Sequence, residues 1–467
     1  MAREVSRTTF KERFHQLDQY LHSKIESGEW APGTYIPSES ELTQTFKLSR
    51  PSVRKAVGKL AEEGLVRTIH GAGSVVCDPA QTSTNLYMYW GMPSYEYETM
   101  KALIDRFNQA NPHIHVELVK TPREALGASA KDGFQVSGKR TDLIGMSNTF
   151  FYQLVDENPK QFLRPLHLDD LSPFSKPHIR AFTHKGRLLA APISFAPIVL
   201  VYNKSMFDAA GLAYPESSWS WQELLQAARA LTRIEGDQTE QYGFSFSASP
   251  NRWPLFVLQN GGSFRSGDGD EPLTDDPASQ EALQFAIDLM YKHKVAPVFA
   301  TENFRLGELL FLREKVGMIL TSYVFLEEFS GIDFEWDYIR FPGEVPDSGL
   351  SLATGIGIST QCEAVDEANQ LIQYLISEEA QSYIKQHVCS IPVRTAVAED
   401  RSLPHSPLAG YSYYLFESLK DNLLTVMDFG LSYKQLTELN QELGLVWANV
   451  ASVDEVWNRL RDQWKRI

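Results

Sequence analysis

One stretch, residues 37–76, constrains this chain more than any other, because it contains two short helical patterns, a turn between them and a glycine-tipped hairpin. Ser38 stands where a helix cap is expected, and Glu41 follows three residues later to complete a capping box. Ser49 can cap the second helix in the same way. The order that we predict is a helix to about Phe46, a turn at 47–49, a helix at 50–63, and strands at 66–69 and 74–76.

The second of these helices has one apolar face and one basic face. Its apolar residues recur at helical spacing and should be buried together: Val53, Ala56, Val57, Leu60 and Ala61. The opposite face carries Arg50, Arg54, Lys55 and Lys59. Such a helix fits the major groove of DNA, and a glycine-rich tip at 70–73 would let the backbone approach phosphates. A surface helix with merely solvated Lys and Arg is the alternative, but the whole series favours binding of duplex DNA.

Residues ~10–77 resemble the winged-helix domain of the gluconate-repressor (GntR) family, an α+β winged helix-turn-helix. The matching segments are 31–34, Pro37-Ser38-Glu39, Leu42, Leu48-Ser49-Arg50, 53–56, Leu60, 63–66 and Gly71-x-Gly73-Ser74. The resemblance implies that Arg50 and Arg54 contact operator DNA and that the wing from His70 to Gly73 reaches the minor groove. The candidate DNA-binding residues are Ser38, Ser49, Arg50, Ser52, Arg54, Lys55, His70, Gly71 and Gly73. The sequence departs from the family at Ser40, where Arg is usual, and at Ala72, where the wing tip is usually basic.

The charge of the chain is unevenly divided. The formal net charge is −15, yet residues 1–80 hold eleven Lys and Arg against ten Asp and Glu. The remainder is therefore strongly acidic and would repel DNA, so we expect a duplex to meet only the N-terminal domain.

Cysteine usage and the N-terminal sequence bear on the compartment. Cys77, Cys362 and Cys389 are few and widely spaced, which predicts a reduced, cytosolic chain. Residues 1–14 are charged and lack the apolar core of a secretion signal. No apolar run reaches the ~18 residues that a membrane span needs. We therefore expect a cytoplasmic protein without membrane contact.

After a short linker predicted at 78–84, strand and helix patterns alternate. Strands are predicted at 86–90, 114–119 and 142–146, a long apolar segment at 188–202, another at 316–320, and helices at 95–110, 219–232, 280–293 and 363–387. Alternation of this kind is typical of an α/β fold with a largely parallel sheet.

Residues ~85–467 resemble family 1 extracellular solute-binding proteins, the sugar receptors of ABC importers. The matching segments are 104–112, Gly186 to Pro192, Val199 to Phe207, Ala210-Gly211-Leu212, 219–224, Gly317 to Tyr323, 355–358 and Ile391 to Arg394. The resemblance implies a two-lobed, type II periplasmic-binding-protein-like α/β fold, with crossover strands and a ligand cleft between the lobes. We assign lobe I to ~85–195 and ~300–348, and lobe II to ~196–299 and ~349–467. The match is poor between Thr121 and Arg140.

Sugars are bound by aromatic faces together with fixed amide, acid and guanidinium groups. By motif position, the candidate ligand-binding residues are Trp90, Asn148, Phe195, Tyr202, Trp253, Tyr323 and Arg394. Each of them also fits a structural role, and Trp219 and Trp221 are assigned to packing. Neither a nucleophile elbow nor a phosphate-binding glycine loop is present, so we expect no enzyme activity, no cofactor and no metal site.

These observations favour a ligand-responsive transcription regulator, in which a carbohydrate or related solute closes the lobes and shifts the DNA-binding domains. Two recognition helices on adjacent half-sites imply a homodimer. The effector, the operator and the sign of regulation stay open. One alternative fuses the winged helix to an aminotransferase-like module that binds pyridoxal phosphate, although the sequence shows no corresponding lysine motif. Another is an intracellular solute-binding protein with little DNA-binding role.

Overall fold

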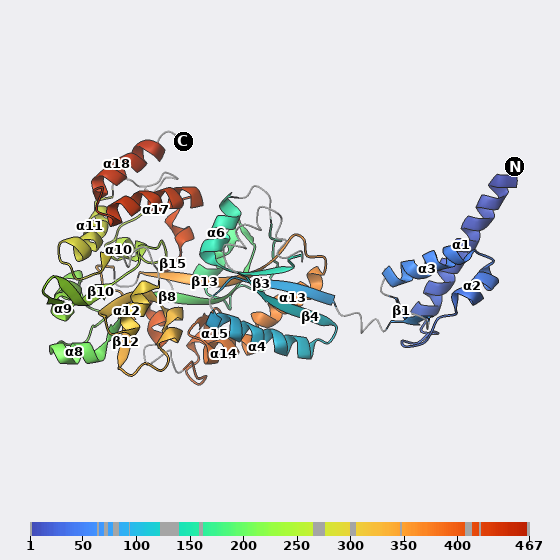
Figure 1. Cartoon of the computed structure of the whole chain (residues 1–467), viewed down its shortest axis with the longest axis horizontal. Coiled ribbons are helices and arrows are strands. Elements are labelled where there is room, and N and C mark those ends of the chain that lie inside the picture. Colours follow the sequence, from blue (N-terminus) through green and yellow to red (C-terminus); the bar gives the residue numbers. More distant parts are fainter. Residues whose placement is uncertain are drawn as a thin grey trace. The chain divides into compact units, whose positions relative to one another are not determined.

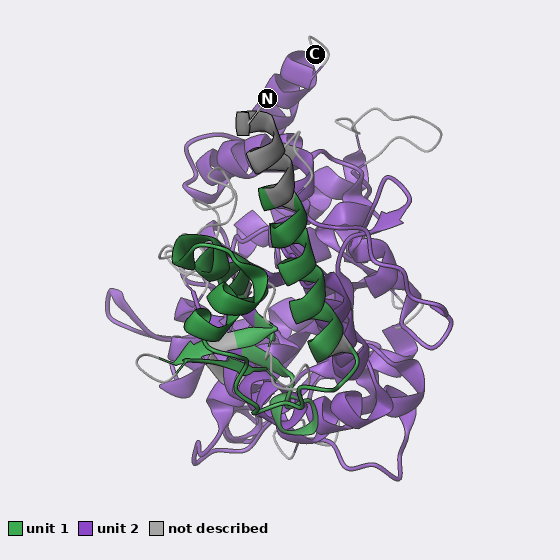
Figure 2. Ribbon diagram, turned by 90° about the vertical axis from the view of Figure 1, so that its right-hand side faces the viewer, with its two compact units in different colours: residues 1–85, 108–116 green, residues 86–107, 117–467 purple. Residues whose placement is uncertain are grey.

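A computed structural model describes residues 2–62, 65–69, 73–77, 84–92, 94–121, 140–157, 162–264, 276–298, 305–345, 348–406, 413–419 and 422–464. The chain divides into two compact units, Met1–Asn85 with Asn108–Val116 and Leu86–Phe107 with Glu117–Ile467, which Figure 2 colours separately. The predicted hairpin tip, including His70 and Gly71, and the predicted linker at 78–83 lie outside the described residues.

The N-terminal unit is a small helical domain with a two-stranded hairpin. Its elements are α1 (Ala2–Glu26), α2 (Glu39–Phe46), α3 (Arg50–Glu62), β1 (Val66–Ile69) and β2 (Gly73–Val76). The strands are antiparallel, with Val66 opposite Val76. One core joins all five elements and contains Leu17, Leu21, Ile36, Leu42, Leu48, Val53, Ala56, Val57, Leu60, Val66 and Val76. The predicted winged helix-turn-helix is therefore confirmed.

Local chemistry explains where α2 begins and ends. The Glu41 backbone N–H donates to Ser38 Oγ (3.3 Å), and the Ser38 N–H donates to Glu41 Oε2 (2.7 Å), which is the predicted capping box. Lys47 then adopts a left-handed conformation with φ of 51° and ends the helix. The turn to α3 is therefore fixed from both sides.

The C-terminal unit is built on one large mixed sheet (Figure 1). Its strands are β3 (Thr84–Trp90), β4 (Ile114–Lys120), β5 (Leu143–Ser147), β8 (Ala191–Asn203), β9 (Arg233–Glu235), β10 (Gln238–Ser245), β11 (Val316–Ser322), β12 (Trp336–Arg340), β13 (Gly349–Ile358), β14 (Ile391–Pro392) and β15 (Leu423–Leu424). The order is β4-β3-β5-β13-β8-β11-β10-β9, with β12 and β14 also on β8 and β15 on β13. Strands β6 (Thr183–His184) and β7 (Arg187–Leu188) form a separate hairpin.

Helices flank this sheet. They are α4 (Ser94–Ala110), α6 (Asn148–Glu157), α7 (Lys176–Ala181), α8 (Lys204–Ala210), α9 (Trp221–Leu231), α10 (Pro254–Gln259), α11 (Pro277–Tyr291), α12 (Leu306–Leu312), α13 (Val365–Leu375), α14 (Glu378–His387), α15 (Thr395–Glu399), α16 (Phe416–Leu419), α17 (Tyr433–Trp447) and α18 (Val453–Trp464), with 3-10 turns η2 (Tyr323–Phe329), η4 (Tyr413–Leu415) and η5 (Val426–Phe429). Within the described residues, no helix is both long and apolar enough to cross a membrane.

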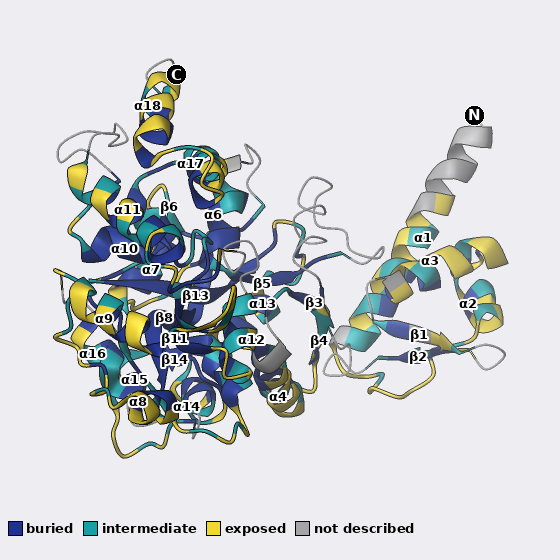
Figure 3. Ribbon diagram, turned by 60° about the vertical axis from the view of Figure 1, so that its left-hand side comes forward, coloured by how far each residue is buried: buried dark blue, intermediate teal, exposed yellow. Residues whose placement is uncertain are grey.

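Strands β8 and β13 cross from one half of the sheet to the other. In the first half, β3 and β5 are parallel and β13 pairs with β5 through 354–358. In the second half, β10 and β11 are parallel and β8 pairs with β11 and β12 through 198–203. The two crossing strands pair with each other between them. Every residue of β8 is buried, as the dark colour of this strand in Figure 3 shows.

This pairing differs from the sequence-based division into lobes. Residues 316–340 were assigned to lobe I, but β11 and β12 pair with β8 in the second half. Residues 354–387 were assigned to lobe II, but β13 ends against β5, and Gln381 of α14 donates to Ile193 O in the first half. The chain thus returns to the first half through β13, and the segment from Val426 to Leu460 packs in the core of the second half. Strand alternation alone does not reveal such returns, because it carries no pairing information.

Trp90 ends β3 in full burial because its neighbour on β5 has no side chain. A Cβ added at Gly145 would lie 2.1 Å from Trp90 Cε3, far inside van der Waals contact. The indole is 1% exposed. Gly145 therefore makes the space for this ring.

We expect Gly145→Ala to destabilise the C-terminal unit by about 1–3 kcal/mol, the usual cost of overpacking. Gly444→Ala is the matched control, because Gly444 lies inside α17 with nothing within 4 Å of an added Cβ. That change should stabilise the helix by about 0.5–1 kcal/mol. Urea unfolding followed by tryptophan fluorescence measures both. Equal stability of Gly145→Ala and the parent protein would contradict the packing argument.

Candidate functional site

The exposed surface of α3 is the first candidate site. Arg50, Arg54 and Lys55 are solvent-exposed, whereas Val53 and Leu60 on the opposite face are fully buried. Arginine and lysine on an exposed helix supply the charged donors that position a protein on phosphates and read base edges. The face that can meet DNA and the face that packs in the core are therefore separate.

The remaining described candidates in this unit lie at the ends of elements. Ser38 caps α2, and the hydroxyls of Ser49 and Ser52 share a hydrogen bond of 2.8 Å at the start of α3. Gly73 starts β2 with φ of 112°, a conformation that favours glycine, and an added Cβ would lie 3.6 Å from the ring of Tyr35.

Arg54 is held by an acidic partner that the sequence analysis did not single out. Its Nε and Nη2 donate to the two carboxylate oxygens of Glu39 on α2, at 3.0 and 2.9 Å. The hydrogen bond from Arg54 lowers the pKa of Glu39. The Arg54 side chain is 73% exposed, so the guanidinium is oriented by Glu39 and still faces solvent.

The second candidate site lies at the carboxyl ends of parallel strands in both halves of the large sheet. Ligands of open α/β sheets bind at such ends. Thr149, which follows β5, donates from Oγ1 to Asn251 Oδ1, which follows β10, at 2.9 Å. Segments that follow strands of the two halves are therefore in direct contact.

Several buried polar side chains at these strand ends, among them Ser245 at the end of β10, each have one atom without a hydrogen-bond partner in the described part of the chain. We call four of them the carboxyl-edge cluster: Trp90 (Nε1), Glu96 (Oε2), Asn148 (Nδ2) and Ser322 (Oγ). Buried polar groups are almost always paired, so each unpaired one needs an explanation, and a bound partner is one such explanation.

Strand register shows how close these groups lie. Asn148 Oδ1 accepts the Ala353 N–H (3.0 Å), and Glu96 Oε1 accepts the hydroxyl of the next residue, Thr354 (3.4 Å). Ala353 lies opposite Phe195 of β8, and Ser322 lies opposite Ile198, three residues further along β8. Three residues of strand span about 10 Å along β8, and β13 and β11, on its two sides, are about 10 Å apart, so these groups lie in one region of the sheet without touching one another.

Glu96 is the ionisable member of this cluster. It lies in the first turn of α4, is 7% exposed, and also accepts the Ser390 hydroxyl at Oε1 (3.2 Å). Burial raises the pKa of the Glu96 carboxyl to about 7, because the charged form loses hydration and the two hydroxyls compensate only in part.

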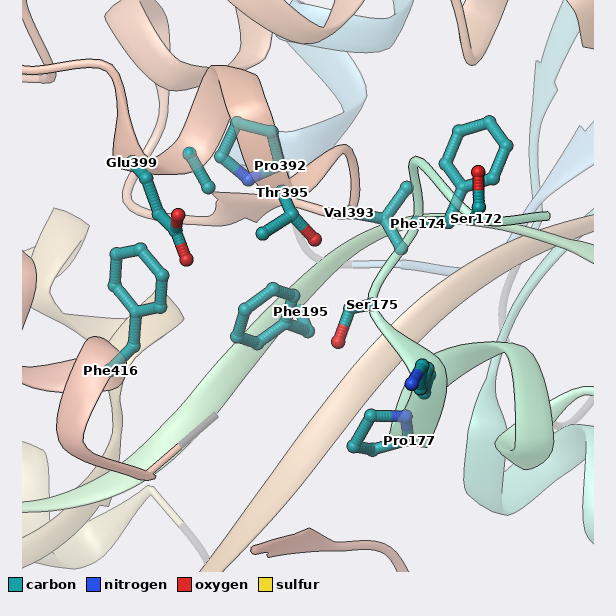
Figure 4. A pocket seen from close by; sticks show the side chains of 12 residues that line it. Ser172, Phe174, Ser175, Pro177, Phe195, Pro392, Val393, Thr395, Glu399 and Phe416 are labelled. Carbon is teal, nitrogen blue, oxygen red and sulfur yellow. The ribbon is translucent and has the colours of Figure 1, made fainter. Parts of the chain in front are cut away.

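A solvent-open cavity of about 240 Å³ lies beside the crossing strands (Figure 4). Its lining includes Phe174, Phe195 and Phe416, with Glu399 beside Phe416 on one side and Ser172 on the opposite side. Behind it, His178 stacks on Phe195 with ring centroids 4.0 Å apart.

The His178 ring also connects the cavity wall to β13. Nδ1 bonds with Ser175 Oγ (2.7 Å) and Nε2 with Ser351 Oγ (3.0 Å). Burial lowers the pKa of His178 to about 3, so the ring is neutral at pH 7. A neutral ring linking two hydroxyls is a structural role, and it ties the cavity wall to a crossing strand.

Comparison with known proteins identifies both units. The family model of bacterial extracellular solute-binding proteins matches residues 93–382, more than half of the chain. The chain belongs to this family. The model of the gntR family of bacterial regulatory proteins matches residues 14–76, so a gntR-type DNA-binding domain precedes the solute-binding domain. Both matched types are regulators or binding proteins, not enzymes.

Curated relatives match the gntR-type domain at the N-terminus. The histidine utilization repressor of Klebsiella aerogenes is 38% identical over 66 residues, which are 14% of this chain and 27% of the relative. The arabinose metabolism transcriptional repressor of Geobacillus stearothermophilus is 42% identical over 67 residues, 14% of this chain and 18% of that protein. The chain thus spans less than a third of these relatives.

Solved structures match the solute-binding domain. The ABC substrate-binding protein Lmo0181 from Listeria monocytogenes, in complex with cycloalternan, has a TM-score of 0.70 and 22% identity, covering 82% of this chain and 98% of that one. Maltose-bound MalE3 of T. maritima has a TM-score of 0.69 and 18% identity, covering 82% and 99%. At these identities the likeness shows the fold, which confirms the predicted two-lobed class.

Within this solute-binding domain, the predicted ligand residues fall into three groups. Trp90 and Asn148 belong to the carboxyl-edge cluster, and Tyr323 follows Ser322 at the end of β11. Phe195 lines the cavity, and the Arg394 guanidinium lies 5.2 Å from the ring centroid of Phe174, another lining residue.

The third group, Tyr202 and Trp253, packs inside the second half. Trp253 donates from Nε1 to Asn440 Oδ1 (2.9 Å) and is fully buried. Tyr202 packs on Phe207 with ring centroids 5.5 Å apart. Both side chains are thus held by core contacts.

Sequence reasoning did not single out Glu96 or Glu39. Both are acidic residues in the first turn of a helix, a position that usually indicates only a favourable helix dipole. The distinguishing features, the burial of Glu96 and the ion pair of Glu39, depend on segments far away along the chain.

We expect Arg50→Ala and Arg54→Ala each to weaken binding of a specific duplex by about 1–3 kcal/mol, the value of a base contact. Because the operator is unknown, the duplex is first selected from a random pool with the parent protein, and affinities are measured by fluorescence anisotropy. Lys59→Ala is the control, since it removes a charge from the same helix but Lys59 pairs with Asp18 (3.2 Å). If Arg50→Ala and Arg54→Ala lose no more duplex affinity than Lys59→Ala, the assignment of α3 as the DNA-contacting helix is contradicted.

The pKa of Glu96 predicts a pH-dependent difference between the parent protein and Glu96→Gln. Between about pH 4.5 and 7 the folded state keeps the proton that the unfolded state releases. The stability of the parent protein should therefore fall by about 3 kcal/mol relative to the variant across this range, and stay constant above it. His178 acts in the opposite direction but is present in both proteins and cancels. Parallel stability profiles, measured by urea unfolding, would show that Glu96 titrates normally.

Proposed function

We propose that this protein is a ligand-responsive transcription regulator, in which a carbohydrate or related solute binds at the carboxyl-edge cluster and changes operator binding by the gntR-type domain. The observation that carries the proposal is the set of buried, unpaired polar groups at the strand ends of both halves of the sheet. They stand in a chain that also contains a DNA-binding domain.

The chemistry of the cluster suits a polyhydroxylated ligand. Trp90 Nε1 and Asn148 Nδ2 are donors, Glu96 Oε2 can accept, and Ser322 Oγ can do both. Every sugar hydroxyl both donates and accepts, and aromatic faces cover its C–H surface. The solved structures of similar fold include proteins bound to cycloalternan, maltose and acarbose, which supports a carbohydrate class for this chain.

Coupling to DNA runs through the crossing strands in this proposal. Asn148 and Glu96 bond to neighbouring residues of β13, Ala353 and Thr354, so a ligand that engages the cluster acts on a strand shared by both halves. A ligand that prefers one arrangement of the halves shifts the population toward it. By linkage, operator DNA then changes ligand affinity by the same factor.

The wider assembly belongs to the same proposal. We assign residues 1–77 to the DNA-binding domain, 78–84 to a linker and 85–467 to the solute-binding domain. A cytoplasmic homodimer would place two α3 helices on half-sites about one helical turn apart.

A thermal-shift screen of the full chain with mono- and oligosaccharides tests the proposal. A sugar at 100 times its dissociation constant should add about 2.7 kcal/mol of stability. The same sugar should change the affinity for the selected duplex about 5–150-fold, in either direction. Arg54→Ala is the control, since it should keep the thermal shift. If a sugar stabilises the protein but leaves duplex affinity unchanged, the coupling is refuted. If none of the sugars stabilises the protein, the carbohydrate class of the ligand is refuted.

A further inference from the structure

Glu96 connects three separate segments of the solute-binding domain through one carboxyl group. It stands in the first turn of α4, and its Oε1 accepts hydroxyls from Thr354 on β13 and Ser390 just before β14. Its Oε2 is buried without a partner among the described residues. One oxygen is thus anchored to a crossing strand, and the other has its acceptor capacity unused among the described residues.

Among the described residues, the surroundings of this carboxyl provide no compensating charge. Strand β13 carries no titratable residue. On the segment before β14, His387 bonds to Tyr383 O, and the Cys389 N–H donates to Glu327 Oε2. Burial raises the pKa of the Cys389 thiol, which keeps it neutral.

The charged residues of α4 near Glu96 face away from it. Glu98 and Lys101 are exposed, and Tyr97 reaches toward Leu118 O (3.5 Å). No charged group contributes to the pKa shift of Glu96, which arises from desolvation opposed by Ser390 and Thr354. A hydrogen-bond donor brought by a ligand would therefore add to the two hydroxyls in stabilising the ionised form.

We propose that Glu96 is a specificity-determining residue of the carboxyl-edge site, whose Oε2 accepts a hydrogen bond from a hydroxyl group of the bound carbohydrate. This inference rests on the proposed function. It adds that the Glu96 carboxylate is the group that recognises a hydroxyl donor of the ligand. A charge-assisted hydrogen bond is roughly twice as strong as a neutral one, so the ligand selects the carboxylate. Binding then expels the Glu96 proton wherever the free protein carries it.

The sign of the pH dependence follows from this selection. Below about pH 7 the free protein holds the proton and must release it on binding, whereas above pH 7 it is already ionised. Affinity should thus rise about tenfold from pH 6 to pH 8 and then level off. A ligand oxygen that accepted a hydrogen bond from the protonated acid would give the opposite trend.

Isothermal titration calorimetry on the full chain tests the inference, with maltose, maltotriose, glucose and arabinose as probes at pH 6, 7 and 8. At pH 6, buffers of different ionisation enthalpy report the protons exchanged. We expect release of nearly one proton at pH 6, little at pH 8, and the tenfold rise in affinity. Glu96→Gln should lose the pH dependence, while Glu98→Gln, an exposed change on the same helix, should keep it.

The outcomes separate this inference from the proposed function. A probe that binds the parent protein without proton release, or with the same pH profile in Glu96→Gln, overturns the role of Glu96 and leaves carbohydrate sensing intact. Failure of every probe to bind the parent protein overturns both. Because the proton count uses the parent protein alone, it decides the question even if Glu96→Gln does not fold.

Discussion

The antiparallel pairing of β8 with β13 is the interaction on which the solute-binding domain depends. Each strand is long enough to pair in one half of the sheet and continue into the other, so the halves share backbone hydrogen bonds instead of a flexible tether. Because both faces of β8 are buried, its register is set by side-chain packing and by its pairing with β13 and β11, and not by an alternation of buried and exposed residues. The strand ends that carry the carboxyl-edge cluster are positioned by these two strands.

Sequence reasoning predicted local structure well and long-range pairing poorly. The capping box at Ser38, the basic face of α3 and the helix break after α4 are encoded within a few residues, and they appear as predicted. The return of the chain through β13 is not encoded locally, because an apolar strand has the same sequence pattern whichever half of the sheet it pairs in. Glu96 illustrates the same limit at the candidate site, because only its distant hydroxyl partners distinguish it from an ordinary acid at a helix start.

The carboxyl-edge cluster also shows how buried, unpaired polar groups oppose stability. A buried carboxyl with a raised pKa and a buried indole N–H without a partner both cost free energy in the folded chain. Trp253 is the contrast, since its indole N–H is satisfied by Asn440 inside a core. Two tryptophans of one domain thus differ in whether their polar atom is already paired.

The contact between Arg54 and Glu39 has a consequence for selectivity among duplexes. An arginine side chain that is already confined to one rotamer loses little further conformational entropy when it docks. The Glu39 carboxylate also competes with DNA for the Arg54 guanidinium. A nucleic acid would bind Arg54 only if it presented a hydrogen-bond acceptor in a better position than Glu39. A single phosphate contact competes poorly with the bidentate hydrogen bonds that the Glu39 carboxylate accepts. In the proposed DNA-binding role, Arg54 would therefore favour duplexes that present such an acceptor over duplexes that do not.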